Sequence, residues 1–254
     1  MTDASYLYLW LNILSVVIPF LFSFYPKANF SNQWRFVFPA MVITAVFFIL
    51  WDEWFTGMAV WGFNPKYLSG VYIFNLPLEE VLFFFCIPYA CVFTHFALSR
   101  LVRKNYFGSH ERHITVALVL LTFATGLSNL HRSYTGLVCV STGVFLFSTL
   151  FWTKPSYMGR FYFSFLVLLI PFAIANGILT GSFIDEAVVW YDNTENLGIR
   201  LGTIPVEDAV YALLLILMNI SIATWLESGG MSVRRRRMEI SQSGGDKIQV
   251  DYSR

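Results

Sequence analysis

Long runs of apolar residues, separated by short polar segments, dominate the chain. A helix needs about 20 apolar residues to cross the hydrocarbon core of a bilayer. The first run is expected to remain as a span, because its nearest basic residue, Lys27, follows it, whereas a secretory signal has basic residues in front. The pattern predicts seven membrane-spanning helices, at residues 5–25, 36–55, 77–99, 113–130, 134–152, 161–181 and 205–226.

The composition agrees with this pattern. Of the 254 residues, 56% are hydrophobic and only 13% are charged, and the net charge is +1. These values are typical neither of a soluble domain nor of a disordered chain, and three cysteines are too few for a disulfide scaffold. The small net charge argues against nucleic acid. We therefore expect an all-α integral membrane protein in contact with the lipid bilayer, with no nucleic-acid partner.

The basic residues predict how the chain crosses the membrane. With the N-terminus outside, 14 of the 17 Lys and Arg residues fall on the inner side, among them Arg234 to Arg237. Cytoplasmic loops carry such an excess. We expect a multi-pass protein of the cell membrane with its N-terminus outside and its C-terminus in the cytoplasm. Residues 229–254 are expected to form a disordered basic tail that binds anionic lipid.

A short motif occurs twice, at the beginning of the third and seventh runs. Pro77-Leu78-Glu79-Glu80 is followed 128 residues later by Pro205-Val206-Glu207-Asp208. Other segments match at offsets of 124 to 129: Arg35 to Phe38 with Arg160 to Phe163, Thr56-Gly57 with Thr180-Gly181, and Val60-Trp61 with Val189-Trp190. The matches predict two tandem parallel three-helix repeats, 1–104 and 133–228, joined by a linker, 105–132, that contains the fourth helix.

Because both motifs begin helices that enter from the same side, their acids are expected to form one composite site in the outer part of the bilayer. A proline followed by an acid is also an ordinary helix start, so one copy alone would say little. Two copies are more informative, since acids at membrane depth are costly and usually line a site or a proton path. Asp52 ends the second run on the same side, where the other half has Asn176. The candidate catalytic residues are Glu79, Glu80, Glu207, Asp208 and Asp52.

Neighbouring carboxyl groups in an apolar pocket can supply a general acid and a general base in one place. Aromatic ring faces nearby can stabilise a cation, although an interfacial aromatic belt explains the same residues equally well. The site therefore suits an apolar substrate that must be protonated. The candidate cation-stabilising residues are Trp51, Trp54, Trp61, Trp190 and Tyr211.

The doubled Pro-x-Glu-acid motif, within two three-span halves, resembles the membrane-embedded lycopene cyclase family of carotenoid biosynthesis. In parts of that family the halves are separate polypeptides. The resemblance implies a lycopene β-cyclase, an isomerase that converts lycopene to γ-carotene and β-carotene without net redox change. The family motif maps onto Glu79, Glu80, Glu207 and Asp208. Among these we expect Glu79 or Glu207 to be the acid, with Glu80 or Asp208 as the base or an orienting partner. Asp52 is added from its depth and side.

The sequence lacks the motifs that bind common cofactors. There is no Gly-x-Gly-x-x-Gly fingerprint, so we expect no flavin. The four histidines, His95, His110, His113 and His131, are scattered and are expected at the interface or in solvent, without a metal. No obligate protein partner is expected.

Two alternatives remain open at this stage. One is a cyclase of the same family that acts on C50 carotenoids. The other is a proton-coupled membrane transporter, because intramembrane carboxylates and parallel repeats are common in transporters. A retinal photoreceptor is disfavoured, since the seventh run has no lysine for the retinal.

Overall fold

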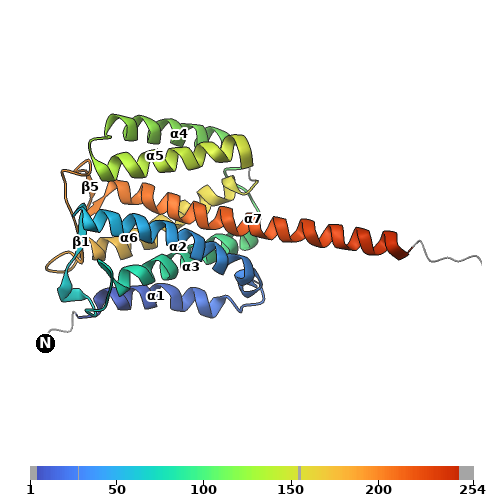
Figure 1. Cartoon of the computed structure of the whole chain (residues 1–254), viewed down its shortest axis with the longest axis horizontal. Helices are drawn as coiled ribbons and strands as arrows, with labels where there is room; N and C mark the ends of the chain where they lie inside the picture. Colours follow the sequence, from blue (N-terminus) through green and yellow to red (C-terminus); the bar gives the residue numbers. More distant parts are fainter. Residues whose placement is uncertain (1–4, 28, 154–155, 246–254) are drawn as a thin grey trace, which may run out of the picture.

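The computed structural model describes residues 5–27, 29–153 and 156–245, and these are mostly helical. Figure 1 shows one bundle with α4 and α5 along one edge, α1 along the opposite edge and α7 between them. The seven α-helices in the described residues are α1 (Leu7–Phe22), α2 (Trp34–Gly57), α3 (Leu78–Leu101), α4 (Glu111–Ser128), α5 (Ser133–Ser148), α6 (Met158–Leu179) and α7 (Val206–Gly245). Short 3-10 turns at Phe30–Gln33 and Pro65–Tyr67 and a π-helical turn at Thr149–Thr153 complete the helical segments.

Five helices of the described part are long and apolar enough to cross a membrane. They are Phe30–Gly57, Leu78–Leu101, Ser133–Phe151, Met158–Leu179 and Val206–Gly229. The other two differ for physical reasons. The 16 residues of α1 rise only about 24 Å, less than the roughly 30 Å of a hydrocarbon core. Helix α4 begins with the polar residues Glu111, Arg112 and His113. That α1 and α4 also span stays a prediction.

The bundle presents apolar side chains on its outside as well as in its core. Leu14, Ile18 and Ile170 are 64%, 64% and 66% exposed. Such a surface is unfavourable in water and is the ordinary outer face of a helix in lipid. The chain is thus a helical membrane protein by length and composition.

In the described residues, six short strands connect the helices at one end of the bundle. Strand β1 (Trp61–Phe63), after α2, pairs antiparallel with β4 (Val189–Tyr191), after α6. Two hairpins lead into the motif helices. They are β2–β3 (Tyr72–Ile73 and Leu76–Pro77), before α3, and β5–β6 (Arg200–Leu201 and Ile204–Pro205), before α7.

Each motif proline ends a hairpin strand and precedes the first residue of its helix. Pro77 pairs with Tyr72, and Pro205 pairs with Arg200. Proline suits this place because its ring fixes φ near the required value and because an initial N–H has no partner inside the helix. The two acids that follow therefore lie in the first turns of α3 and α7.

Helix α7 continues to Gly245, past the boundary expected at residue 228. Figure 1 shows its C-terminal part projecting away from the bundle. The run of arginines there favours helical backbone by its intrinsic propensity, so helix replaces the disorder expected for residues 229–245. The rest of the expected tail, 246–254, lies outside the described residues.

Candidate functional site

An apolar cavity of about 270 Å³ lies inside the bundle, lined by side chains of α1, α2, α3, α5, α6 and α7 and of strands β1 and β4. Three of the five candidate carboxylates line it, namely Asp52, Glu80 and Asp208. They are only 2%, 8% and 5% exposed. Buried acids in an apolar cavity are costly unless hydrogen bonds compensate them, so their partners define what the site can do.

The first acid of each motif does not line the cavity but holds a loop. The Oε1 atom of Glu79 accepts the backbone N–H of Ser69 at 2.7 Å. The Oε1 atom of Glu207 accepts the backbone N–H of Leu197, also at 2.7 Å, and the hydroxyl of Thr135 at 2.6 Å. In both halves this contact spans ten residues and ties the segment before the hairpin to the start of the helix.

The second acid of each motif faces the cavity and accepts a tyrosine hydroxyl. Tyr8 of α1 donates to Glu80 Oε2 at 2.5 Å, and Tyr134 of α5 donates to Asp208 Oδ1 at 2.6 Å. The two tyrosines are 126 residues apart and the two acids 128 apart. Both tyrosines also line the cavity, so each donor is buried beside its acid.

Asp208 has two further donors, both on Oδ2. The Nδ2 atom of Asn176 lies 2.7 Å away and the hydroxyl of Tyr191 lies 3.1 Å away. Burial, and then the neighbouring Asp208 carboxyl, raise the pKa of Tyr191 well above its ordinary value, so this hydroxyl stays protonated and donates. Together with Tyr134, three neutral donors serve one carboxylate, which is a pattern that stabilises its ionised form.

Asp52 has fewer donors. The indole Nε1 of Trp61 donates to its Oδ1 at 2.5 Å, while its Oδ2 is buried and has no hydrogen-bond partner among the described residues. Its neighbour Glu53 does not line the cavity. That side chain accepts the backbone N–H of Asn75 at 3.1 Å and its Nδ2 at 2.5 Å, and so caps the β2–β3 turn.

Only two of the five candidate aromatic residues line the cavity, Trp61 and Tyr211. Trp51 packs behind Tyr211, with ring centroids 5.7 Å apart. Trp54 and Trp190 are 56% and 44% exposed and do not line the cavity.

The two exposed tryptophans follow from backbone periodicity. Trp54 lies two residues after Asp52 on α2, which turns it by about 200° away from the cavity. Trp190 stands between two strand residues that line the cavity, Val189 and Tyr191, so it points to the opposite face. A Cβ atom at Gly62, its strand partner, would come within 2.6 Å of the Trp190 ring.

Several residues of the site were not predicted. A signal for Tyr8 and Tyr134 was present in the sequence, because they stand 126 residues apart, close to the offset of 128 between the motifs, each in the first helix of its predicted half. For Tyr191 the sequence held no signal except that it follows Trp190. Asn12 belongs to the site because its Nδ2 donates to the backbone oxygen of Glu79 at 2.8 Å. It is one polar residue in an apolar helix, and nothing in the sequence pattern indicated that it contacts the motif.

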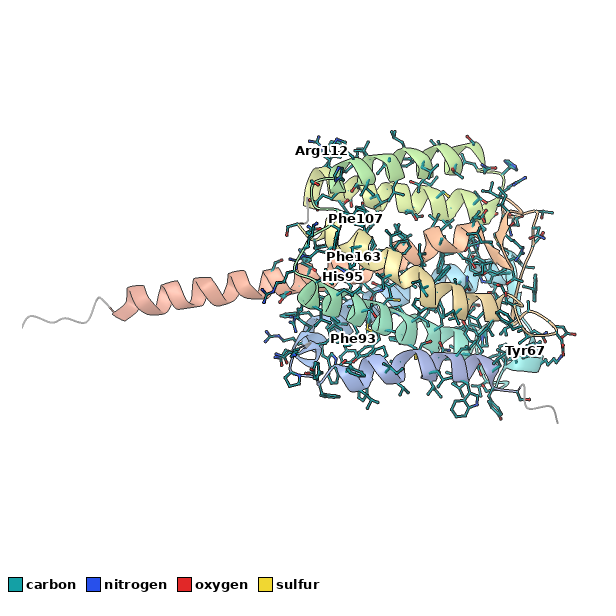
Figure 2. All side chains as sticks on the ribbon, turned by 180° about the vertical axis from the view of Figure 1, so that it is seen from behind. Tyr67, Phe93, His95, Phe107, Arg112 and Phe163 are labelled. Atoms are coloured by element: carbon teal, nitrogen blue, oxygen red, sulfur yellow. The ribbon has the colours of Figure 1, made fainter. Side chains whose placement is uncertain are left out.

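One histidine differs from the expectation. His95 is buried, 4% exposed, and its Nδ1 lies 3.0 Å from Ser164 Oγ on α6, because α6 packs over this turn of α3. Figure 2 shows His95 and Tyr67 at opposite ends of the bundle, so His95 is remote from the carboxylates. Among the described residues, no group of three or more His, Cys, Asp or Glu side chains could hold a metal ion. The absence of metal and flavin stays a prediction.

The fold and the cavity define a helical membrane protein whose buried carboxyl groups and their tyrosine donors line space for an apolar molecule. Comparison with known families identifies the family within this class. A family model described as lycopene cyclase matches residues 5–98 and 131–226, which is well over half of the chain. The chain belongs to the lycopene cyclase family.

Two fungal proteins described as bifunctional lycopene cyclase/phytoene synthase are similar to part of the chain. The protein of Aspergillus oryzae is 29% identical over 122 residues, which cover 45% of this chain and 21% of the fungal protein. The protein of Aspergillus niger is 29% identical over 100 residues, which cover 35% and 17%. The matched regions are thus about a fifth of the length of these relatives. No solved structure matches the chain.

Proposed function

We propose that the protein is a lycopene β-cyclase, which closes β rings at the ψ ends of lycopene and yields γ-carotene and then β-carotene. One observation carries the proposal: three buried carboxyl groups, Asp52, Glu80 and Asp208, meet at one apolar cavity. Family membership supports a carotenoid as the substrate. The cavity offers few polar groups beyond those acids and their donors, which suits a hydrocarbon.

The reaction needs one proton delivered and one removed. A carboxylic acid protonates the terminal double bond and leaves a tertiary cation. The neighbouring double bond attacks this cation and closes a six-membered ring, and a carboxylate then takes a proton from the ring to form the alkene. No electrons are gained or lost, so neither oxidant nor reductant is required. The position of the base decides which proton leaves, and hence whether a β or an ε ring forms.

The hydrogen bonds suggest which group has which role. Asp208, with three neutral donors, is suited to be the carboxylate base. Asp52 and Glu80, with one side-chain donor each, are suited to share the proton that is delivered. We therefore assign the acid to the Asp52–Glu80 side of the cavity. Glu79 and Glu207 position the hairpins, in place of the acid role expected from the sequence.

Trp61 and Tyr211 are the aromatic side chains suited to stabilise the cation. Both line the cavity with the acids, and their rings lie 6.4 Å apart at an interplanar angle of 87°. A ring face within about 6 Å attracts a cation without reacting with it as a base would. The buried position also keeps water, which would quench the cation, away from it.

We also propose that the site is built from two parallel repeats of the chain. Two parallel repeats, 1–104 and 133–228, joined by the linker 105–132, would place α3 and α7 in equivalent positions. The antiparallel pairing of β1 with β4 and the matching contacts of the two motifs support this arrangement. All seven helices would span, with the N-terminus outside, and the basic tail after residue 228 would lie on the cytoplasmic side.

Expression in a bacterium that accumulates lycopene tests the proposal. Pigments are separated chromatographically for the natural sequence and for Glu80→Gln and Asp208→Asn, at matched membrane levels. We expect γ-carotene and β-carotene from the natural sequence, and a loss of at least about a hundredfold in each variant, because a positioned acid or base contributes that much. Asp185→Asn is the matched control, since Asp185 is an exposed loop residue near Lys66. Unchanged lycopene beside well-inserted protein would refute the C40 reaction and lead to C50 carotenoids as the next substrates.

A further inference from the structure

The cavity extends from the carboxylates along one face of α3. Its floor is formed by Phe83, Ile87, Ala90 and Thr94, which follow Glu80 at helical spacing. From Glu80 to Thr94 the helix rises about 21 Å at 1.5 Å per residue. The space is therefore long and narrow, with the acids at one end.

Helices α1 and α6 form the two walls. Helix α1 contributes Leu11, Ser15 and Pro19, and α6 contributes Phe165 and Phe172. Figure 2 shows α6, α3 and α1 in this order across the rear of the bundle, so α3 lies between the walls. We call this part of the cavity the α3 groove.

The α3 groove combines α1 and α3 of one half with α6 of the other, so its equivalent around α7 would lie between α5 and α2. Bulky side chains occupy that equivalent place. At offsets of 124 to 128, within the range that relates the two halves, small groove residues are replaced by larger ones that fill the space. Trp51 is buried, and Phe145 and Met218 pack against the core. The replacements are Ala90 to Met218, Thr94 to Ile222, Pro19 to Phe145, and Ala175 to Trp51.

We propose that the α3 groove binds the extended polyene arm of the substrate, with one ψ end at the carboxylates and the remainder leaving between α1 and α6 into the lipid. This inference rests on the proposed function and adds where and how the substrate lies. The occupant is a linear conjugated hydrocarbon, because the groove is apolar, narrow and continuous with the acids. A single groove admits one end at a time. A monocyclic product must leave and return reversed before its second ring can close.

Retention of substrate by an inactive variant tests the groove directly. The Asp208→Asn variant is purified in mild detergent from lycopene-accumulating cells, and the carotenoid bound per protein is measured by absorbance. Adding Ala90→Met places the residue of the other half in the groove, and we expect retention to fall about tenfold or more, since overfilling a packed site costs one or more factors of ten. Adding Ala117→Met, the same exchange on the exposed face of α4, should leave retention unchanged.

The possible outcomes distinguish a failure of the groove proposal from a failure of the proposed reaction. Equal retention with and without Ala90→Met, or no retention by Asp208→Asn itself, overturns the groove. Failure of the natural sequence to cyclise lycopene overturns the proposed function, while the retention pattern still decides the groove. If Ala90→Met inserts poorly, as judged by size-exclusion chromatography, Thr94→Ile fills the groove one turn further along and replaces it, with the same expected loss.

Discussion

At the scale of single residues, the two acids of each motif are separated by what they contact. Consecutive helix positions differ by about 100° in direction, so one acid can face a loop while the next faces the cavity. Glu79 holds a backbone N–H of its loop, and Glu80 accepts a hydroxyl inside the cavity. Glu207 and Asp208 repeat this division. The motif thus combines a structural acid with an acid suited to proton transfer.

This division predicts different outcomes for Glu80→Gln and Glu79→Gln. The first removes a titratable group from the cavity, and cyclisation should fall about a hundredfold or more. The second keeps an acceptor oxygen for the Ser69 N–H, so turnover per folded protein should stay within about threefold, since a neutral acceptor retains most of an ordinary hydrogen bond. Chromatographic pigment yield, normalised to membrane protein, checks both. The reverse order of effects would contradict the assignment.

The donors around Asp208 lead to a second prediction. Tyr134→Phe removes the 2.6 Å hydrogen bond, and activity should fall about ten- to a hundredfold, because a hydrogen bond to a charged group contributes about 1.5–3 kcal/mol. Initial rates in proteoliposomes measure this loss. Tyr162→Phe is the matched control, since the Tyr162 hydroxyl bonds to Thr115 and does not line the cavity. Equal rates for all three proteins would count against Asp208 as the base.

At the scale of elements, the β1–β4 pair connects the segment after α2 to the segment after α6. It carries Trp61 and Tyr191 to the cavity from opposite halves of the chain. The pair depends on a close contact, because the Trp190 ring lies against the bare Cα of Gly62.

That contact predicts a destabilising substitution and its rescue. In Gly62→Ala the new methyl group would clash with the Trp190 ring. The free energy of unfolding should therefore fall by about 1–3 kcal/mol, as for other overpacked sites. The melting temperature of the purified protein reports this change. Adding Trp190→Ala to the Gly62→Ala chain should recover most of the lost stability. If the double variant melts no higher than Gly62→Ala alone, the contact is not the cause.

Most helices could be predicted from the sequence, whereas their partners could not. Each predicted run coincides with a helix, because hydropathy and breaking residues act locally. The contact between Tyr8 and Glu80 joins residues 72 apart, and no local pattern encodes it. Trp54 and Trp190 were assigned to the site by proximity in sequence, but helix and strand periodicity direct them outward.

At the scale of the whole molecule, similar halves enclose one groove. The space around α3 is lined by Ala90 of α3 and Ala175 of α6, whereas the equivalent positions around α7 hold Met218 of α7 and Trp51 of α2. The sequence showed that the halves are similar but not equivalent, through Asp52 and Asn176. Which of the two equivalent places stays open depends on the side-chain volumes that several helices bring together, and a four-residue motif does not encode them.

One groove predicts the order of products. In a time course with limiting protein, γ-carotene should accumulate freely before β-carotene appears, because the second ring requires release and reversed binding. Chromatography of samples from successive times measures the two pigments. Appearance of β-carotene without a lag, and with no free γ-carotene at any time, would contradict a single groove.

The central claim is that carboxyl groups start and finish the reaction by proton transfer. Its most direct test is the mass of the product formed in D₂O by purified protein, equilibrated in advance and in excess over lycopene, so that each site acts once. We predict a single deuterium for each ring closed, since the buried acids exchange with solvent before substrate binds. Cyclised product that contains no deuterium would contradict it.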